Sequence, residues 1–244
     1  MATTASKEPR EGTDFFPLTV DYEEKMYAVG KMPGGFLRRE GRPGNSAILN
    51  ARLIDRPIRP LFDKRCRNDV HVVATVLSVD YDNAPELCGM LGASASIGIS
   101  DIPWDGPIAG VRIGRVDGKY VVNPTQEQLA ESSMNITVAG SEEAIMMVEG
   151  GANEAPEEEV LDAIMFGHET IKELCRFQKK IIEEVGKPKR TMVFPEVPEE
   201  IDEAVAAYAT EDLKKAIFDA DKLRRDGNID AVKKAAKEHF ADIY

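Results

Sequence analysis

Residues 34–62 read GGFLRREGRPGNSAILNARLIDRPIRPLF, a stretch that concentrates arginine in a chain that is otherwise acidic. From Lys31 to Arg67 there are ten Lys or Arg and three Asp or Glu residues, which gives a local charge of about +7. The whole chain of 244 residues carries −12, so the remainder carries about −19 (−12 minus +7). Because a solubilising surface mixes both signs of charge, a positive segment inside an acidic chain indicates an anion-binding site.

Glycine and proline residues predict a loop in the first half of this stretch. Pro33 and Pro43 bracket the loop, and its glycines permit backbone conformations that other residues avoid. The predicted tip carries an aromatic ring beside two guanidinium groups, in the order Phe36, Leu37, Arg38 and Arg39. Bases stack on rings while arginine pairs with phosphate, so this combination favours single-stranded nucleic acid. The alternative is a solvated loop whose arginines pair with surface carboxylates.

The second half of the stretch, ARLIDRPIRPLF, predicts a basic helix. Arg52, Arg56 and Arg59 are four and three residues apart, so a helix places them on one face, and Pro57 and Pro60 are expected to end that helix. Such a face can hold a phosphate through bidentate hydrogen bonds. It can equally be structural, with Asp55 and other carboxylates as partners. The sequence leaves both interpretations open.

The surrounding sequence predicts strands and helices in an α+β arrangement. Strands are expected within 15–27 and 70–80, a helix from Pro85, a hairpin at Asp117-Gly118, a second hairpin that places 134–139 opposite 144–149, and a long helix over 156–185. Proline-rich residues 187–197 predict a linker. Residues 198–244 predict a small all-helical unit with breaks at 210–212 and 226–228, and the lack of a cap signal at its end suggests a truncated domain.

The sequence lacks the patterns of membrane-spanning, secreted, disulfide-bonded and zinc-binding proteins. No apolar run has membrane-spanning length and the opening lacks a signal-peptide core, so we expect a soluble, cytoplasmic protein. Cys66, Cys88 and Cys175 lack the spacing of a zinc site or a disulfide framework. The acidic run 157–159 fits the start of a helix better than a metal site. We therefore expect no metal site and no complete catalytic constellation.

Five segments follow one another in a specific order over nearly the whole chain: GTDFFPLTVDYEEKMYAVGKMPGGFLRREGRP, ARLIDRPIRPLF, VVATVLSVDYDNAPE, GASASIGISDIPWDGPI and VAGSEEAIMMVEGGA. They resemble the polynucleotide phosphorylase (polyribonucleotide nucleotidyltransferase) family of phosphate-dependent exoribonucleases, which are built on duplicated RNase PH-like domains. The resemblance implies that residues 1–186 are the first such domain, an α+β (two-layer α/β) fold of the ribosomal protein S5 domain 2-like type. Residues 198–244 would begin an all-α domain. The family's N-terminal β-hairpin is missing, which is expected to leave a sheet edge open.

The resemblance also implies a homotrimeric ring that threads single-stranded RNA through a central channel. The family's constriction loop matches 36–39 here, although Leu37 stands where a second phenylalanine is common, so stacking would depend on Phe36. Further arginines match basic positions at the channel entrance. The RNA-binding residues implied are Phe36, Arg38, Arg39, Arg42, Arg52, Arg56 and Arg59.

Catalysis is expected elsewhere in the complete enzyme. The resemblance implies that the second RNase PH-like domain holds Mg²⁺ and uses inorganic phosphate, with two aspartates six residues apart ahead of a VAG strand. Glu127 and Ser133 occupy those places here, so we expect no catalytic or metal-binding residue in this segment. Two other interpretations remain: an anion-binding enzyme for a nucleotide or sugar phosphate, and a purely structural oligomerisation scaffold.

Overall fold

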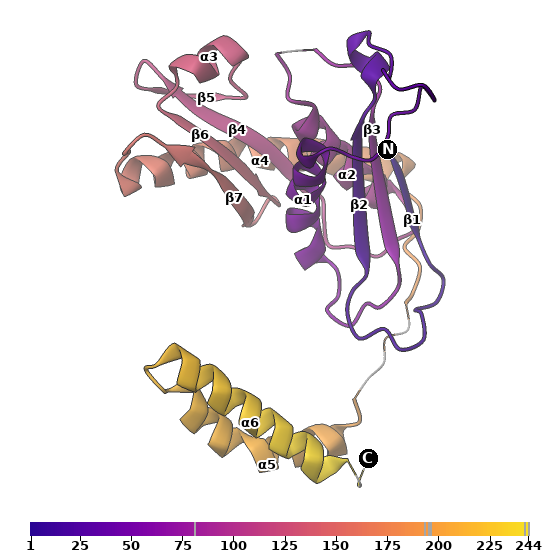
Figure 1. Ribbon diagram of the computed structural model, residues 1–244, viewed down its shortest axis with the longest axis vertical. Coiled ribbons are helices and arrows are strands. Elements are labelled where there is room, and N and C mark those ends of the chain that lie inside the picture. Colours follow the sequence, from indigo (N-terminus) through magenta and orange to yellow (C-terminus); the bar gives the residue numbers. More distant parts are fainter. Residues whose placement is uncertain (81, 193, 195–196, 242, 244) are drawn as a thin grey trace. The chain divides into compact units, whose positions relative to one another are not determined.

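The computed structural model describes residues 1–80, 82–192, 194, 197–241 and 243. Residues 1–194 and 195–244 form two compact units, each of which is described by itself (Figure 1). In the described part of the chain, no helix has the length and apolar character that crossing a membrane requires.

A three-stranded sheet opens the first unit. Its strands are β1 (Ala2–Ala5), β2 (Leu18–Glu24) and β3 (Val70–Val76). Strand β3 lies in the middle, parallel to β2 and antiparallel to β1. Burial alternates along β3, which turns Val70, Val72 and Ala74 toward the core. The strands predicted within 15–27 and 70–80 are confirmed, whereas β1 was not predicted because four residues of Ala and Thr give too short a pattern.

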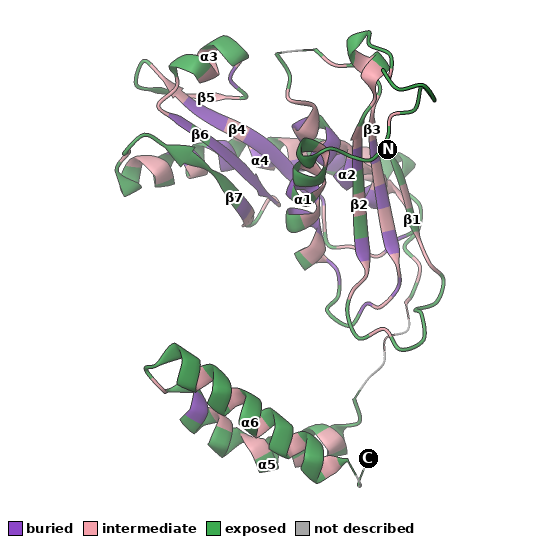
Figure 2. Cartoon of the chain, in the orientation of Figure 1, coloured by how far each residue is buried: buried purple, intermediate pink, exposed green. Residues whose placement is uncertain are grey.

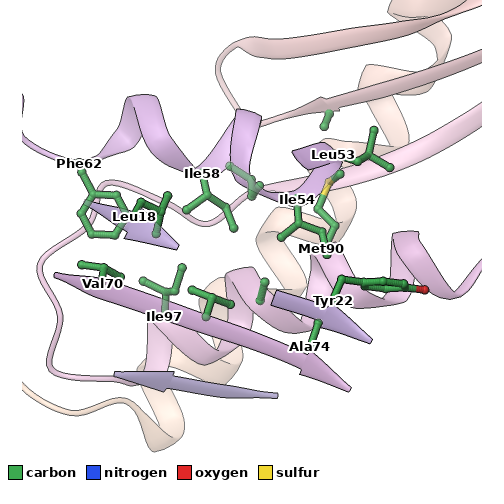
Figure 3. Packing of buried hydrophobic residues seen from close by; sticks show 14 of the residues in the cluster. Leu18, Tyr22, Leu53, Ile54, Ile58, Phe62, Val70, Ala74, Met90 and Ile97 are labelled. Atoms are coloured by element: carbon green, nitrogen blue, oxygen red, sulfur yellow. The ribbon is translucent and has the colours of Figure 1, made fainter. Parts of the chain in front are cut away.

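Two helices, α1 (Asn45–Ile58) and α2 (Pro85–Ile99), pack on this sheet. Figure 3 shows their side chains, including Ile54 and Met90, interleaved with those of β2 and β3. The helix predicted from Pro85 is confirmed, with the proline in the first turn.

The predicted end of the arginine helix needs a correction. Pro57 lies inside the last turn of α1, which continues to Ile58 before a short 3-10 helix, η2 (Arg59–Leu61), takes over. A proline removes only its own N–H, and the backbone N–H of Arg59 restores the helical pattern by donating to the carbonyl of Asp55. Pro57 therefore does not end the helix.

A second sheet is antiparallel throughout, in the order β5-β4-β6-β7. Its strands are β4 (Ala109–Val116), β5 (Lys119–Val122), β6 (Met134–Gly140) and β7 (Ile145–Ala152). Asp117 and Gly118 have positive φ angles of 50° and 75°, so the first predicted hairpin is confirmed. The second hairpin forms in a different register from the predicted one, since Met134 pairs with Ala152 and β7 extends three residues past Glu149.

The long helix α4 (Glu157–Val185) covers one face of the second sheet, as Figure 1 shows, and confirms the prediction for 156–185. A Cβ on Gly167 would lie 3.0 Å from the side chain of Ile113, so glycine allows α4 to approach β4 closely. On the other face, a Cβ on Gly110 of β4 would lie 2.5 Å from the sulfur of Met90 in α2. Helix α2 therefore contacts both sheets, and the α+β fold class is confirmed.

The second unit is a pair of helices, α5 (Glu199–Ile217) and α6 (Lys222–Phe240). Both helices are mostly exposed in this unit, with half-buried residues at intervals along each of them (Figure 2). Among the described residues of the two helices, Ala216 alone is buried. The predicted breaks at 210–212 and 226–228 are wrong, because both segments lie inside helices. The chain turns instead just before Asp221, whose side chain caps α6 by accepting the backbone N–H of Arg224.

The start of the segment expected to be a linker is bound to the first unit. The backbone N–H groups of Lys187 and Arg190 donate to the carbonyls of Ile99 and Asp101. The ammonium of Lys189 donates to three carbonyls at the end of α2, those of Ile97, Gly98 and Ser100, at 3.1, 2.8 and 2.8 Å. Burial lowers the pKa of Lys189. This lysine therefore caps the C-terminus of α2, where a positive charge is favoured.

Replacing Lys189 by Met is expected to destabilise the first unit. The substitution keeps most of the side-chain volume but removes a charged donor from three helix-end carbonyls, so the free energy of unfolding should fall by about 1–2 kcal/mol. Urea denaturation measures this loss. Lys187→Met is the matched control, because no hydrogen bond of the Lys187 side chain is found among the described residues. Equal stability of the two variants would contradict the capping role.

Candidate nucleic-acid interface

The loop between η1 (Met26–Val29) and α1 presents apolar and basic side chains to solvent. We call residues 31–44 the arginine loop. The side chain of Phe36 at its tip is 100% exposed and that of Leu37 is 69% exposed. The backbone N–H of Arg38 donates to the carbonyl of Gly35 at 3.0 Å, and Arg38 adopts a left-handed φ of 52°. A non-glycine residue in this region is uncommon and is often found at binding sites.

Four guanidinium groups of the basic stretch are available to an external anion. Arg38, Arg39, Arg42 and Arg52 are exposed, and none of them forms an ion pair or a side-chain hydrogen bond with any described residue. An arginine without an internal partner keeps all five N–H donors for a ligand. The solvated-loop alternative, in which surface carboxylates hold these arginines, therefore has no support in the described part of the chain.

Arg56 differs from these four because it reaches across to the second sheet. Its Nη1 donates to Oε2 of Glu149 on β7 at 2.6 Å. Both side chains are about half exposed, at 47% and 58%. A pair in such a solvated position contributes at most about 1 kcal/mol. Another anion of similar geometry can therefore replace the Glu149 carboxylate at little cost.

Arg59 is committed to the fold. Its Nε and Nη2 donate to the two carboxylate oxygens of Asp55 at 3.0 and 2.8 Å, and its Nη1 and Nη2 donate to the carbonyls of Phe16 and Leu18 at 3.1 and 3.0 Å. These four bonds use four of the five N–H donors, and the guanidinium also lies over the Phe16 ring, 5.8 Å from its centroid. The geometry thus favours the structural interpretation at this position.

A groove of about 370 Å³ is lined by residues of both α1 and β2, alongside the region where the two elements pack together. Arg52 lines it beside the Asp55–Arg59 pair, and Ile48 and Pro43 extend its wall toward the arginine loop. The three arginines predicted on one helical face are thus divided: Arg52 and Arg59 line the groove, whereas Arg56 pairs with β7. Helix spacing is compatible with the Asp55–Arg59 pair, but it could not show that Arg56 pairs with Glu149, because Glu149 lies on β7.

The acidic side chains nearest to the loop have partners of their own. Glu23 pairs with Lys25 at 2.6 Å, and this hydrogen bond is the main cause that raises the pKa of Lys25. Glu24 accepts from the hydroxyl of Tyr22 at 2.8 Å, and burial raises the pKa of Tyr22. Glu40 accepts from the backbone N–H of Met26. The contact of Glu40 was not predicted from the sequence, because an acid between arginines in RREGR suggests an ion pair with them and not a hydrogen bond from Met26.

The resemblance matches Glu127 and Ser133 to the family's two aspartates, and only one of the two is a carboxylate. Glu127 is exposed in the first turn of the short helix α3 (Gln126–Glu131), and Ser133 follows that helix with its backbone N–H bonded to the carbonyl of Arg115 at 3.1 Å. Across the described residues, no group of three or more His, Cys, Asp or Glu side chains is placed to hold a metal ion. A single carboxylate and a serine hydroxyl are a poor donor set for magnesium, which is usually bound by carboxylates.

Two family models match the first unit. The model described as "3' exoribonuclease family, domain 1" matches residues 1–103, and the one described as "3' exoribonuclease family, domain 2" matches residues 106–170. The matches meet between α2 and β4, where the chain passes from the first sheet to the second. Together they cover well over half of the chain.

Curated relatives extend the similarity to the whole chain. The chain is 56% identical to a polyribonucleotide nucleotidyltransferase of Heliobacterium modesticaldum, over 99% of this chain and 35% of the relative. It is 55% identical to the proteins of that name from Syntrophomonas wolfei, over 100% of this chain and 35% of the relative, and Brevibacillus brevis, over 98% and 33%. The chain thus spans about a third of the length of these relatives. It belongs to the 3′ exoribonuclease family, and the resemblance of its sequence to polynucleotide phosphorylase is confirmed.

Proposed function

We propose that this chain is the RNA-binding, trimer-forming part of a polynucleotide phosphorylase. The complete enzyme would attack the terminal 3′ phosphodiester of RNA with inorganic phosphate and release nucleoside diphosphates. Membership of the 3′ exoribonuclease family and the name of the relatives support this proposal. The role of this segment rests on one observation: a fully exposed aromatic ring, that of Phe36, lies in the same basic stretch as guanidinium groups that have no ion pair or side-chain hydrogen bond to a described residue. These are the guanidinium groups of Arg38, Arg39, Arg42 and Arg52.

The residues predicted to bind RNA would differ in what they do on a single strand. Guanidinium groups bind phosphate through two parallel N–H bonds, and a base stacks on the ring of Phe36 without regard to its identity. Arg56 would exchange the Glu149 carboxylate for an RNA phosphate. Arg59 would act indirectly, by fixing Asp55 and the start of β2 against α1. The predicted RNA-binding set therefore divides into direct ligands and one supporting residue.

The remaining components of the proposal come from the family. We place Mg²⁺ and inorganic phosphate in the second RNase PH-like domain of the complete enzyme, which assembles as a homotrimer in the cytoplasm without a membrane partner. Magnesium would stabilise the charge that develops on the transferred phosphoryl group. The residues of the present chain supply no step of that transfer. Their contribution is to bind the strand and direct it.

Replacing Arg38 and Arg39 together by Ala is expected to weaken binding of an oligoribonucleotide. Each phosphate contact on a single strand contributes about −0.7 to the log–log salt slope, so losing two should flatten the slope by about 1.4. Thermal stability should stay unchanged, because side chains at an exposed loop tip contribute little to a core. Fluorescence anisotropy at several salt concentrations measures the slope.

The adjacent pair Arg224 and Arg225 on α6 provides the matched control, since Arg224→Ala with Arg225→Ala removes the same charge from the second unit. That control should leave the slope close to the wild-type value. Two results would count against RNA as the ligand: an unchanged slope in the loop variant, or a mononucleotide that competes as strongly as the oligonucleotide. The second result would favour a small-molecule site.

The chain alone is expected to be catalytically inactive. Because Ser133 stands where the resemblance puts the second aspartate, we expect that Glu127 does not organise a metal ion for phosphoryl transfer, and no group of three or more metal-ligating side chains is found among the described residues. Incubation with oligoadenylate, inorganic phosphate and magnesium should release no ADP above a control without protein, even when RNA binding is saturated. Phosphate-dependent release that persists after removal of host enzymes and disappears in Glu127→Gln would show that this segment has a catalytic site.

A further inference from the structure

The arginine loop has few attachments to the rest of the molecule. Its first residue, Lys31, donates its backbone N–H to the carbonyl of Met26, and the bond from Arg38 to Gly35 lies within the loop. Among the described residues, no other backbone hydrogen bond is formed by 32–43. The residues from Gly34 to Arg39 are all exposed. A loop of this length without further ties would sample many conformations.

Glu40 supplies the missing attachment. Its two carboxylate oxygens lie 3.1 and 3.3 Å from the backbone nitrogen of Met26, fourteen residues earlier in the chain. Met26 begins η1, so its N–H lacks a helical partner and needs an acceptor. Glu40 is half-buried. Within the part of the chain that the structure describes, no other side chain of the arginine loop is hydrogen-bonded to the rest of the protein. It closes the loop at its base.

The same contact keeps the loop's own acid away from its arginines. Glu40 stands one residue after Arg39 and two before Arg42, close enough in sequence to pair with either. Neither arginine forms an ion pair with it. Because the carboxylate is directed to Met26, both guanidinium groups remain free for phosphate. A carboxylate released from Met26 would be available to compete with the ligand.

We propose that Glu40 is a positioning residue for RNA binding, which holds the arginine loop closed at its base before RNA arrives. This inference rests on the proposed function, because it assigns Glu40 a role at the same site. A preformed loop loses less conformational freedom on binding than a mobile one, so the attachment raises affinity without touching the ligand. The negative charge of Glu40 would by itself act in the opposite direction and repel RNA.

These opposing effects make the two simplest substitutions informative. Glu40→Ala removes both the acceptor and the charge, whereas Glu40→Gln removes the charge and keeps an amide oxygen that accepts from Met26. We expect Glu40→Ala to bind an oligoribonucleotide roughly fivefold to tenfold more weakly than the wild type, and Glu40→Gln to bind as tightly or more tightly. Glu11→Ala, which removes an exposed acid from another loop, is the control for net charge. It should not weaken binding.

Trypsin cleavage after Arg38 and Arg39, measured without RNA, reports the loop's mobility separately. Glu40→Ala should be cut roughly tenfold faster than the wild type, and Glu40→Gln at a similar rate to it. Equal melting temperatures would confirm that all three variants fold.

The outcomes separate this inference from the function on which it rests. A wild-type chain that binds no RNA would overturn the proposed function, and the positioning role with it, whatever trypsin shows. A wild-type chain that binds RNA while Glu40→Ala binds equally well or better would overturn only the role of Glu40. Weakened binding in both Glu40→Ala and Glu40→Gln would also overturn it, since the acceptor that Gln retains would then be irrelevant.

Discussion

The burial of α1 against the first sheet is the constraint on which the rest of the site depends. Ile54 and Ile58 are fully buried in the core with β2 and β3, which fixes the rotation of the helix about its axis (Figure 3). Once that face is buried, Arg52 and Arg56 must lie on the exposed side. The N-terminus of α1 is also where the arginine loop ends. Packing of two isoleucines thereby decides where the positive charge is presented.

Carboxylates near the basic stretch determine which arginines can bind an anion. Asp55 engages Arg59 through two bonds, and Glu149 engages Arg56 through one exposed bond, so these two arginines differ in how readily they can be released. Glu23 and Glu24 are bound to Lys25 and to the hydroxyl of Tyr22. Because Glu23 and Glu24 already have partners, they leave the positive charge of the arginine loop in place.

Much of the fold was predictable because its signals are local. The Asp117-Gly118 turn, the proline at the start of α2 and the periodicity of α4 each depend on neighbouring residues, and each prediction is confirmed. The register of the β6–β7 hairpin was not predicted correctly, because the loop lies at 141–144 instead of 140–143 and an irregularity between Ala139 and Gly140 shifts the pairing by one further residue.

The candidate site likewise has features that could be predicted from the sequence and features that could not. Exposure of Phe36 followed from the glycines and prolines around it, and Asp55, four residues before Arg59, was one of the partners that the sequence offered. In contrast, the partners of Arg56 and Glu40 lie 93 and 14 residues away, and the Phe16 carbonyl that Arg59 also binds lies 43 residues away. No spacing rule links such distant positions. A helical face of three arginines could therefore be recognised from the sequence, but not its division into free and committed members.

The central claim is that arginines without a partner among the described residues bind RNA, whereas Arg59, with its four internal hydrogen bonds, holds the fold. Arg52→Ala and Arg59→Ala test it most directly, because both residues line one groove, Arg52 from α1 and Arg59 from η2. Oligoribonucleotide affinity and urea denaturation should be measured for both variants. Arg52→Ala should weaken binding severalfold at unchanged stability, and Arg59→Ala should lower the free energy of unfolding by about 2 kcal/mol. Loss of stability in Arg52→Ala, or full stability with lost binding in Arg59→Ala, would contradict the claim.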